Sequence, residues 1–395
     1  MPSHIQHEIA QNLDLDQLTA LRKEIHQHPE LSHYEGQTAE RIKRFLTQYN
    51  PTEIIESIGG SGMIALWTFS EDGPAVLFRC ELDALPIQEI NDDLLYKSVV
   101  ANVGHKCGHD GHMASVAGLA QLLHQKPFTR GKVMLLFQPA EETGEGAAEM
   151  LEDEKMKAIQ PDYVFAYHNL PGYPLGQVLT RENTFAPASA GMEVFLYGAT
   201  SHAGEPERGN SPALPMSNII QAITDLPQSG RYDGFVLTTV IHALLGEVAF
   251  GISPGYGEVR ATLRAHLDSD MEKLKQQAEA IVKQHATAKN LEHKIGYREV
   301  FPAVTNHEEA MTFLNAAIEA GKLNQQTLKE PVRWSEDFAH FTNRFPGALF
   351  CLGSGKNQPA LHNADYDYPD ELLPDAVQLF YNIADQILRE ERHGS

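Results

Sequence analysis

The sequence has few cysteines, a shortage of positive charge and no long apolar run. Three cysteines in 395 residues are too few for a disulfide framework and favour a reducing compartment. Lys and Arg number 31 against 53 Asp and Glu, which gives a formal net charge of −22. Nucleic acids and anionic membranes are bound by basic surfaces, so the composition argues against both partners. No apolar run reaches the ~20 residues that span a bilayer, and the N-terminal segment lacks the basic and apolar regions of a signal peptide. We therefore expect a cytoplasmic protein.

What the chain does contain is an ordinary globular composition and many metal-ligand side chains. Hydrophobic residues make up 42% and charged residues 21%, enough for a sizeable core. The length suggests two or three domains. Nineteen histidines and 53 carboxylates could serve as metal ligands.

Short apolar runs alternate with helical patterns in the first part of the chain. The runs predict strands that are buried on both faces of a largely parallel sheet, at residues 63–69, 75–80, 133–137 and 163–167. Apolar spacing predicts one helix that ends before Pro29 and two more over residues 38–49 and 112–124. This alternation predicts an α/β/α domain with a mostly parallel central sheet.

The pattern changes in the middle of the chain. From residue 191 to about 304 the order is strand, helix, strand, strand, helix, strand, which is typical of a ferredoxin-like α+β unit. Helix–strand alternation resumes afterwards, with a helix to about 320, another at 336–342, a strand at 348–352 and a final helix from about 371. We predict a discontinuous domain over 1–187 and 303–395, interrupted by an inserted domain over 188–302.

Three of the predicted strands lead into polar residues. Asp83 follows the second strand, Glu141 and Glu142 follow the third, and His168 ends the fourth. The carboxyl ends of parallel strands open onto one crevice, so these side chains predict a site there.

Cys107 and His109 flank a glycine just before a predicted helix. An isolated cysteine is usually a small buried hydrophobe. The neighbouring imidazoles and the acidic strand ends instead favour ligation of Zn²⁺ or another late first-row ion. His112 falls in the first helical turn, so we interpret it as structural. For His362, spacing alone leaves a structural role and a ligand role equally open.

The adjacent carboxylates Glu141 and Glu142 point in different directions from one loop. One can bind metal while the other takes a proton from water, which is the division of labour in metal-assisted hydrolysis. A solvated acidic pair is the alternative, and the buried strand that precedes the pair argues against it.

Together these motifs resemble the zinc-peptidase superfamily of aminoacylases and carboxypeptidase-G-like enzymes. Within it, they are most similar to the amidohydrolase subfamily of hippurate hydrolase, N-acyl-amino-acid amidohydrolases and plant auxin-conjugate hydrolases. The similarity covers almost the whole chain in family order, and the matching segments are 21–31, 83–87, 107–112, 138–144, 168–172 and 336–338.

The resemblance implies a catalytic domain with a paired-metal centre and an inserted lid domain that usually dimerises. Carried over by motif position, it implies one set of metal ligands, namely Cys107, His109, Glu142, His168 and His362. It makes Glu141 the general base and places Asp83 behind the metal ligands as a supporting carboxylate.

Two further residues lie in the predicted lid. The resemblance implies that His202 reaches a neighbouring subunit's active site and stabilises an oxyanion, whereas by itself it would be a surface turn histidine. Arg260 matches an arginine that meets the substrate carboxylate in relatives, and a strand-edge ion pair is equally compatible with its position. Residues 250–254 lack the asparagine of the family's Asn-x-Ile-Pro element, and Glu81 and Asn363 also depart from the usual pattern, so the motifs leave substrate choice open.

We therefore predict a metal-dependent amidohydrolase that cleaves N-acyl-amino acids, small-molecule substrates such as hippurate. A dipeptidase, carboxypeptidase or N-deacetylase with the same dinuclear centre is the alternative. A non-catalytic metal-binding or ligand-binding protein is a rival from another class, and a redox or nucleophilic role for the Cys107 thiol is a third possibility. We expect two divalent ions per subunit, with Zn²⁺ favoured and Mn²⁺, Ni²⁺ and Co²⁺ open, and a homodimer or higher homo-oligomer formed through the lid.

Overall fold

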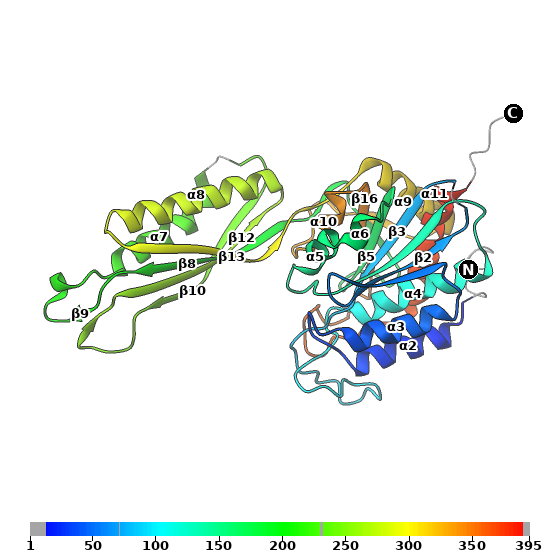
Figure 1. Ribbon diagram of the computed structural model, residues 1–395, viewed down its shortest axis with the longest axis horizontal. Coiled ribbons are helices and arrows are strands. Elements are labelled where there is room, and N and C mark those ends of the chain that lie inside the picture. Colours follow the sequence, from blue (N-terminus) through cyan, green and yellow to red (C-terminus); the bar gives the residue numbers. More distant parts are fainter. Residues whose placement is uncertain (1–12, 71, 230–231, 390–395) are drawn as a thin grey trace. The chain divides into compact units, whose positions relative to one another are not determined.

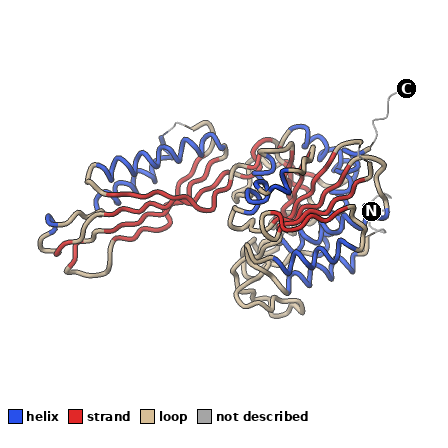
Figure 2. The backbone as a smooth tube through the Cα atoms, viewed as in Figure 1, coloured by secondary structure: helices blue, strands red, loops and turns tan. Residues whose placement is uncertain are grey.

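The computed structural model describes residues 13–70, 72–229 and 232–389, and its chain divides into two compact units (Figures 1 and 2). The first unit comprises residues 1–185, 304–330 and 337–395, and the second comprises 186–303 and 331–336. The second unit is therefore inserted into the first. Within the described residues, no helix has the length and apolar character needed to cross a bilayer.

An eight-stranded mixed sheet forms the centre of the first unit. Its four middle strands run parallel, in the order β4 (Lys132–Gln138), β3 (Ala75–Glu81), β5 (Tyr163–Leu170) and β16 (Gly347–Gly353). The sheet continues through β2 (Gly62–Thr68) and β1 (Glu53–Ile58) at one edge, and through β6 (Val178–Thr180) and β15 (Gln325–Thr327) at the other. The predicted α/β class with a mostly parallel central sheet is confirmed.

One of the predicted strands has the opposite direction. The strand predicted at 63–69 is β2, and it is antiparallel to both of its neighbours, β1 and β4. Only three residues connect β1 to β2, and so short a connection can join antiparallel strands but not parallel ones.

Helices pack against this sheet. Asp14 caps α2 (Leu15–Gln27) by accepting a hydrogen bond from the amide of Gln17. Figure 1 shows α2, α3 (Gly36–Thr47) and α4 (His109–Gln125) on one side of the sheet, and their apolar side chains share one core with the strands. Every residue of α4 from 109 to 123 is buried, which is expected of a helix covered on all sides. The other helices among the described residues of this unit are α5 (Gly146–Glu152), α6 (Glu154–Lys157), α9 (Glu308–Gly321), α10 (Ala339–Thr342) and α11 (Leu373–Leu388).

The second unit has the element order expected from the sequence. Its antiparallel sheet has the order β10, β12, β8, β13, and two helices lie along one face. The bounds are β8 (Ala188–Tyr197), α7 (Ala213–Asp225), β10 (Val236–Leu245), β12 (Tyr256–Ala265), α8 (Asp268–Thr287) and β13 (Glu292–Phe301). On β12, buried and half-buried residues alternate, and Val259, Ala261 and Leu263 point into this unit's own core.

Several elements differ from the sequence-based expectation. The helix predicted at 336–342 begins only at Ala339, and the final helix is preceded by a short 3₁₀ turn at Asp370–Leu372. Short strands pair in two small ladders, β7 (Asn183–Ala186) with β14 (Val304–Asn306) and β9 (Ser201–His202) with β11 (Ile252–Ser253). None of these four strands was predicted, because two to four residues are too few to show a period.

Candidate metal centre

The carboxyl ends of the middle strands bring the polar residues of the sequence motifs together. Glu81 at the end of β3 is in register with Gln138 at the end of β4, and the loops after these strands carry Asp83 and the Glu141–Glu142 pair. His168 lies near the carboxyl end of β5, in register with Cys351 of the parallel strand β16. The sheet edge thus gathers carboxylates and an imidazole, as parallel strands do.

A glycine sets the approach of Cys107 and His109 to this edge. Gly108 precedes α4 with a φ of +95°, a left-handed conformation that favours glycine. A Cβ atom there would lie 2.4 Å from Oδ1 of Asn169. Gly108 therefore allows the backbone to pass directly against β5, and its two neighbours face the site.

Two groups of potential ligand atoms lie side by side and share one sulfur. Cys107, His109 and His168 form the first group, with Sγ of Cys107 only 3.4 Å from Nε2 of His168. Cys107, Glu142 and His362 form the second, with Nε2 of His362 3.7 Å from a carboxylate oxygen of Glu142. Within each group all ligand atoms lie within 4.8 Å of one another. All five predicted ligands therefore meet in one cluster, in an arrangement that fits two divalent cations.

Hydrogen bonds orient two of the imidazoles for ligation. Nδ1 of His109 lies 2.9 Å from the carbonyl oxygen of Asp83, and Nδ1 of His168 lies 2.8 Å from the carbonyl oxygen of Asn169. A carbonyl can only accept, so each Nδ1 carries the proton and each Nε2 presents a lone pair when the ring is neutral. Among the described residues, Nε2 of His109 has no hydrogen-bond partner although the ring is 1% exposed. A buried nitrogen without a hydrogen-bond partner is suited to bind a metal ion.

The charges around His109 favour a cation. Burial lowers the pKa of His109, but the hydrogen bond to Asp83 and the charges of Glu81 and Glu142 outweigh it and raise that pKa to about 10. For His168, burial and the neighbouring His112 hold the pKa well below its usual value. Burial raises the pKa of Asp83, yet its contacts with His109, the Glu142 amide and Ser32 bring it below the ordinary value. The cluster therefore carries excess negative charge that bound cations would neutralise.

Glu141 lies beside the ligand groups without being needed to complete either. Its Oε2 is 3.8 Å from Nε2 of His109, and the residue is buried. A carboxylate in this position can act as a proton acceptor next to the cations.

Comparison with known proteins agrees with this geometry. Residues 77–386 match the model of peptidase family M20/M25/M40. The chain belongs to this family. Hippurate hydrolase of Campylobacter jejuni is 31% identical over 96% of this chain and 99% of its own length, and an N-acetylcysteine deacetylase of Bacillus subtilis is 30% identical over 93% and 96%.

A solved structure extends the likeness to three dimensions. A dinuclear metal-binding M20 peptidase from Bacillus subtilis superposes with a TM-score of 0.79 at 27% identity, covering 95% of this chain and 98% of that one. As a member of family M20, the protein is a metal-dependent hydrolase that acts on C–N bonds.

Beneath the ligands, this M20 hydrolase has a polar network that the sequence did not reveal. Arg79 contacts Glu81 and lies 2.7 Å from Asp337, which in turn accepts a hydrogen bond of 2.7 Å from the Gln138 side chain. Glu81 accepts from Nδ1 of His112 at 2.7 Å, so His112 is a network residue, in keeping with the structural role expected of it. The available signals were Glu81, which departs from the family pattern, and the places of Gln138 and Asp337 in the matching segments 138–144 and 336–338.

A second unforeseen contact supports the Glu141 loop of the M20 site. Ala140 has a φ of +49°, unusual for a residue other than glycine, and its amide donates a 2.8 Å hydrogen bond to Glu35. Glu35 is fully buried on the N-terminal side of α3. It therefore holds the backbone immediately before the predicted general base.

The two predicted lid residues of this M20 chain lie in the second unit. His202 is exposed on β9, and its Nδ1 accepts a 3.0 Å hydrogen bond from the Gly204 amide, so the neutral ring carries its proton on Nε2. Arg260 contacts Glu258 and lies 3.2 Å from Glu193 on the face of the sheet. The ion pair that was one of the two roles expected of Arg260 is therefore present. Contact between Arg260 and substrate stays a prediction.

Proposed function

We propose that the protein hydrolyses the amide bond of N-acyl-amino acids to a carboxylate and an amino acid. The observation that carries the proposal is the pair of ligand groups sharing Cys107, with the Glu141 carboxylate beside them. Two relatives that align over nearly the whole chain are named for hippurate and N-acetylcysteine, which are both N-acyl-amino acids.

In this proposal, Glu141 removes a proton from the attacking water and delivers it to the departing amine. Cations held by the five ligands would lower the pKa of water and polarise the amide carbonyl. Asp83 orients His109 through its carbonyl and the Glu142 loop through its carboxylate, which accepts the Glu142 amide at 3.0 Å. A positioned general base such as Glu141 contributes about 10²–10⁴-fold to the rate.

The donor set supports Zn²⁺ as the preferred metal. A thiolate and imidazoles are poor ligands for Mg²⁺ and Ca²⁺ but good ligands for Zn²⁺, while Mn²⁺, Co²⁺ and Ni²⁺ are the other candidates. All three cysteines are buried thiols, which suits the reducing cytoplasm that we propose as its location.

The proposal also includes a homodimer formed through the second unit. Strand β10 ends the sheet, and no other strand among the described residues pairs with its outer edge. Exposed apolar side chains lie along it, including Leu237 and Ile241. An apolar sheet edge is a natural template for a second strand. In such an assembly His202 would act in the neighbouring subunit's site, as the family resemblance implies.

A substrate panel tests this function. The protein is stripped with a chelator, resupplied separately with Zn²⁺, Mn²⁺, Co²⁺ or Ni²⁺, and assayed on hippurate, N-acetyl-amino acids and dipeptides. We expect metal-dependent release of amino acid from N-acyl substrates. Turnover of dipeptides alone would favour a peptidase, and chelator-resistant turnover would contradict metal-dependent chemistry.

A further inference from the structure

Five buried charged side chains form a continuous chain behind the ligand cluster. Nζ of Lys106 lies 2.7 Å from Glu89, and Glu89 lies 3.0 Å from Nε2 of His26. Nδ1 of His26 lies 2.9 Å from Asp110, which lies 3.0 Å from Arg22. Each of the five is at most 1% exposed. Two members of this ionic chain, Lys106 and Asp110, are the residues immediately before Cys107 and immediately after His109.

Stability by itself explains such a chain poorly. Moving charges out of water is costly, and apolar side chains of similar volume often replace buried ion pairs without loss. The contacts of the ionic chain also require one protonation state of His26. Both nitrogens of His26 face carboxylate oxygens, which can only accept, so the ring must donate twice as an imidazolium. Each contact is therefore directional and fixes the positions of the groups that it joins.

The ionic chain fixes both sides of a short segment that contains a flexible glycine. Between Lys106 and Asp110 lie only Cys107, Gly108 and His109, and a glycine has more backbone freedom than any other residue. The carbonyl oxygen of Lys106 also accepts a 2.8 Å hydrogen bond from the amide of His362. Three of the five predicted ligands, Cys107, His109 and His362, thus depend on backbone that the ionic chain anchors.

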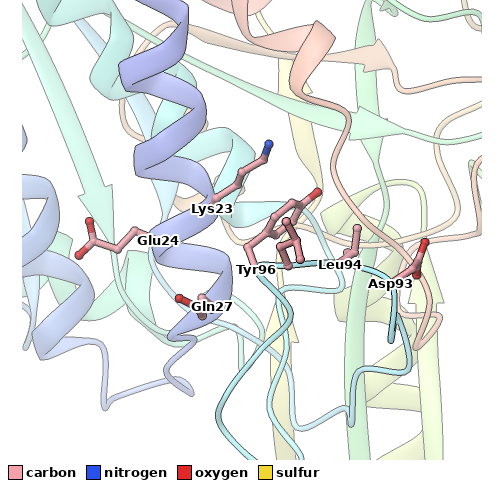
Figure 3. A pocket seen from close by; sticks show the side chains of 7 residues that line it. Lys23, Glu24, Gln27, Asp93, Leu94 and Tyr96 are labelled. Carbon is pink, nitrogen blue, oxygen red and sulfur yellow. The ribbon is translucent and has the colours of Figure 1, made fainter.

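The last side chain of the ionic chain, Arg22, is itself buried and contacts two partly exposed residues, Asp367 and Tyr96. Arg22 pairs with Asp367 at 2.9 Å and lies 4.8 Å from the centre of the Tyr96 ring, and the Tyr96 hydroxyl donates to Asp367 at 2.7 Å. Figure 3 shows this tyrosine beside Lys23 of α2, where both line a surface pocket. The Tyr96 ring lies against the Arg22 guanidinium, and the burial of the charged groups strengthens their interactions.

We propose that His26 and Glu89 are positioning residues that preorganise the metal centre. By joining Lys106 to Asp110 across the backbone, they hold Cys107, His109 and His362 in place before the metals bind. They touch neither substrate nor the reacting atoms. The inference rests on the proposed two-metal function, yet its consequence is measured as metal affinity, without any substrate.

The test compares metal affinity in His26→Gln, Glu89→Gln and Leu18→Ala. Leu18 is buried on the same helix α2 and has no part in the ionic chain, so Leu18→Ala controls for a general loss of stability. Zn²⁺ binding is measured by competition with a chelator, below the unfolding temperature of every variant. We expect about 10–100-fold weaker binding in His26→Gln and Glu89→Gln, and a change of less than about threefold in Leu18→Ala.

One further measurement and a second variant keep the outcome decisive. Co²⁺ bound to the Cys107 thiolate would give a charge-transfer absorption, and we expect this absorption to weaken in the two chain variants but not in Leu18→Ala. Should His26→Gln be recovered unfolded, Glu89→Gln carries the test, since it keeps the shape of the side chain. Zn²⁺ affinity in the chain variants equal to that of Leu18→Ala would overturn the proposal. A wild-type protein that binds Zn²⁺ but turns over no N-acyl substrate would instead overturn the proposed function.

Discussion

The main-chain carbonyl oxygen of Asp83 lies 2.9 Å from Nδ1 of His109, and the carboxylate of the same residue accepts the amide of Glu142. One residue thus orients an imidazole from the start of α4 and a carboxylate from the loop after β4. Mutation of a supporting residue of this kind typically costs about 10–100-fold in metal affinity or activity.

Replacing Asp83 tests this relationship. Asp83→Ala keeps the carbonyl but removes the carboxylate that holds the Glu142 loop, and we expect Zn²⁺ affinity to fall about 10–100-fold. Ser32→Ala is the matched control, because it removes only the 2.8 Å hydrogen bond that Ser32 donates to the same carboxylate. Equal affinities for Asp83→Ala and wild type, measured by chelator competition, would rule out the supporting role.

Glu141 should separate catalysis from metal binding. Glu141→Gln keeps the size of the side chain but removes its basicity, so we expect kcat to fall about 10²–10⁴-fold while two metals remain bound. Glu145→Gln in the same loop is the control, since Glu145 is exposed and pairs with His33. Steady-state kinetics and metal analysis of both variants decide the question, and near-wild-type turnover in Glu141→Gln would remove Glu141 from the mechanism.

The stabilising effect of His26 should depend on pH. Hydrogen bonds and charges from Asp110 and Glu89 outweigh burial and raise the pKa of His26 from 6.5 to about 9. Because the folded-state pKa is raised, the contribution is complete below about pH 6.5 and disappears as the pH rises through about 9. Its full size is on the order of 3 kcal/mol. Urea unfolding of wild type and His26→Gln at several pH values should show a difference in unfolding free energy that shrinks between pH 6.5 and 9.5. A difference that stays constant would mean that His26 does not titrate in this range.

The edge of β10 should decide the oligomeric state. Ile241 on this strand is 63% exposed, and a charge placed there would be buried in the proposed interface. We expect Ile241→Lys to weaken the dimer at least about tenfold in sedimentation equilibrium. Leu95→Lys, at an exposed apolar residue of the first unit, should leave it unchanged. A dimer that tolerates Ile241→Lys would place the interface elsewhere.

Local patterns were sufficient for the main elements of the fold. The apolar runs of β3, β4 and β5 are continuous because both faces of these strands are buried, and the predicted strands match the observed ones within a few residues. β1 was not predicted because most of its residues are exposed or half-buried, which leaves no clear period. The antiparallel direction of β2 could not be predicted from its sequence pattern either, since it depends on the hairpin with β1.

The site divides in the same way. The sequence by itself determined which side chains could do the chemistry, because Cys107 and His109 lie in one short motif and Glu141 and Glu142 lie in another. Only the tertiary structure decided how they are held. His362 reaches the cluster through a backbone hydrogen bond to Lys106, and His26 joins Glu89 to Asp110. These contacts join residues far apart in the chain, and hydrogen bonds between such residues depend on packing that no local pattern records.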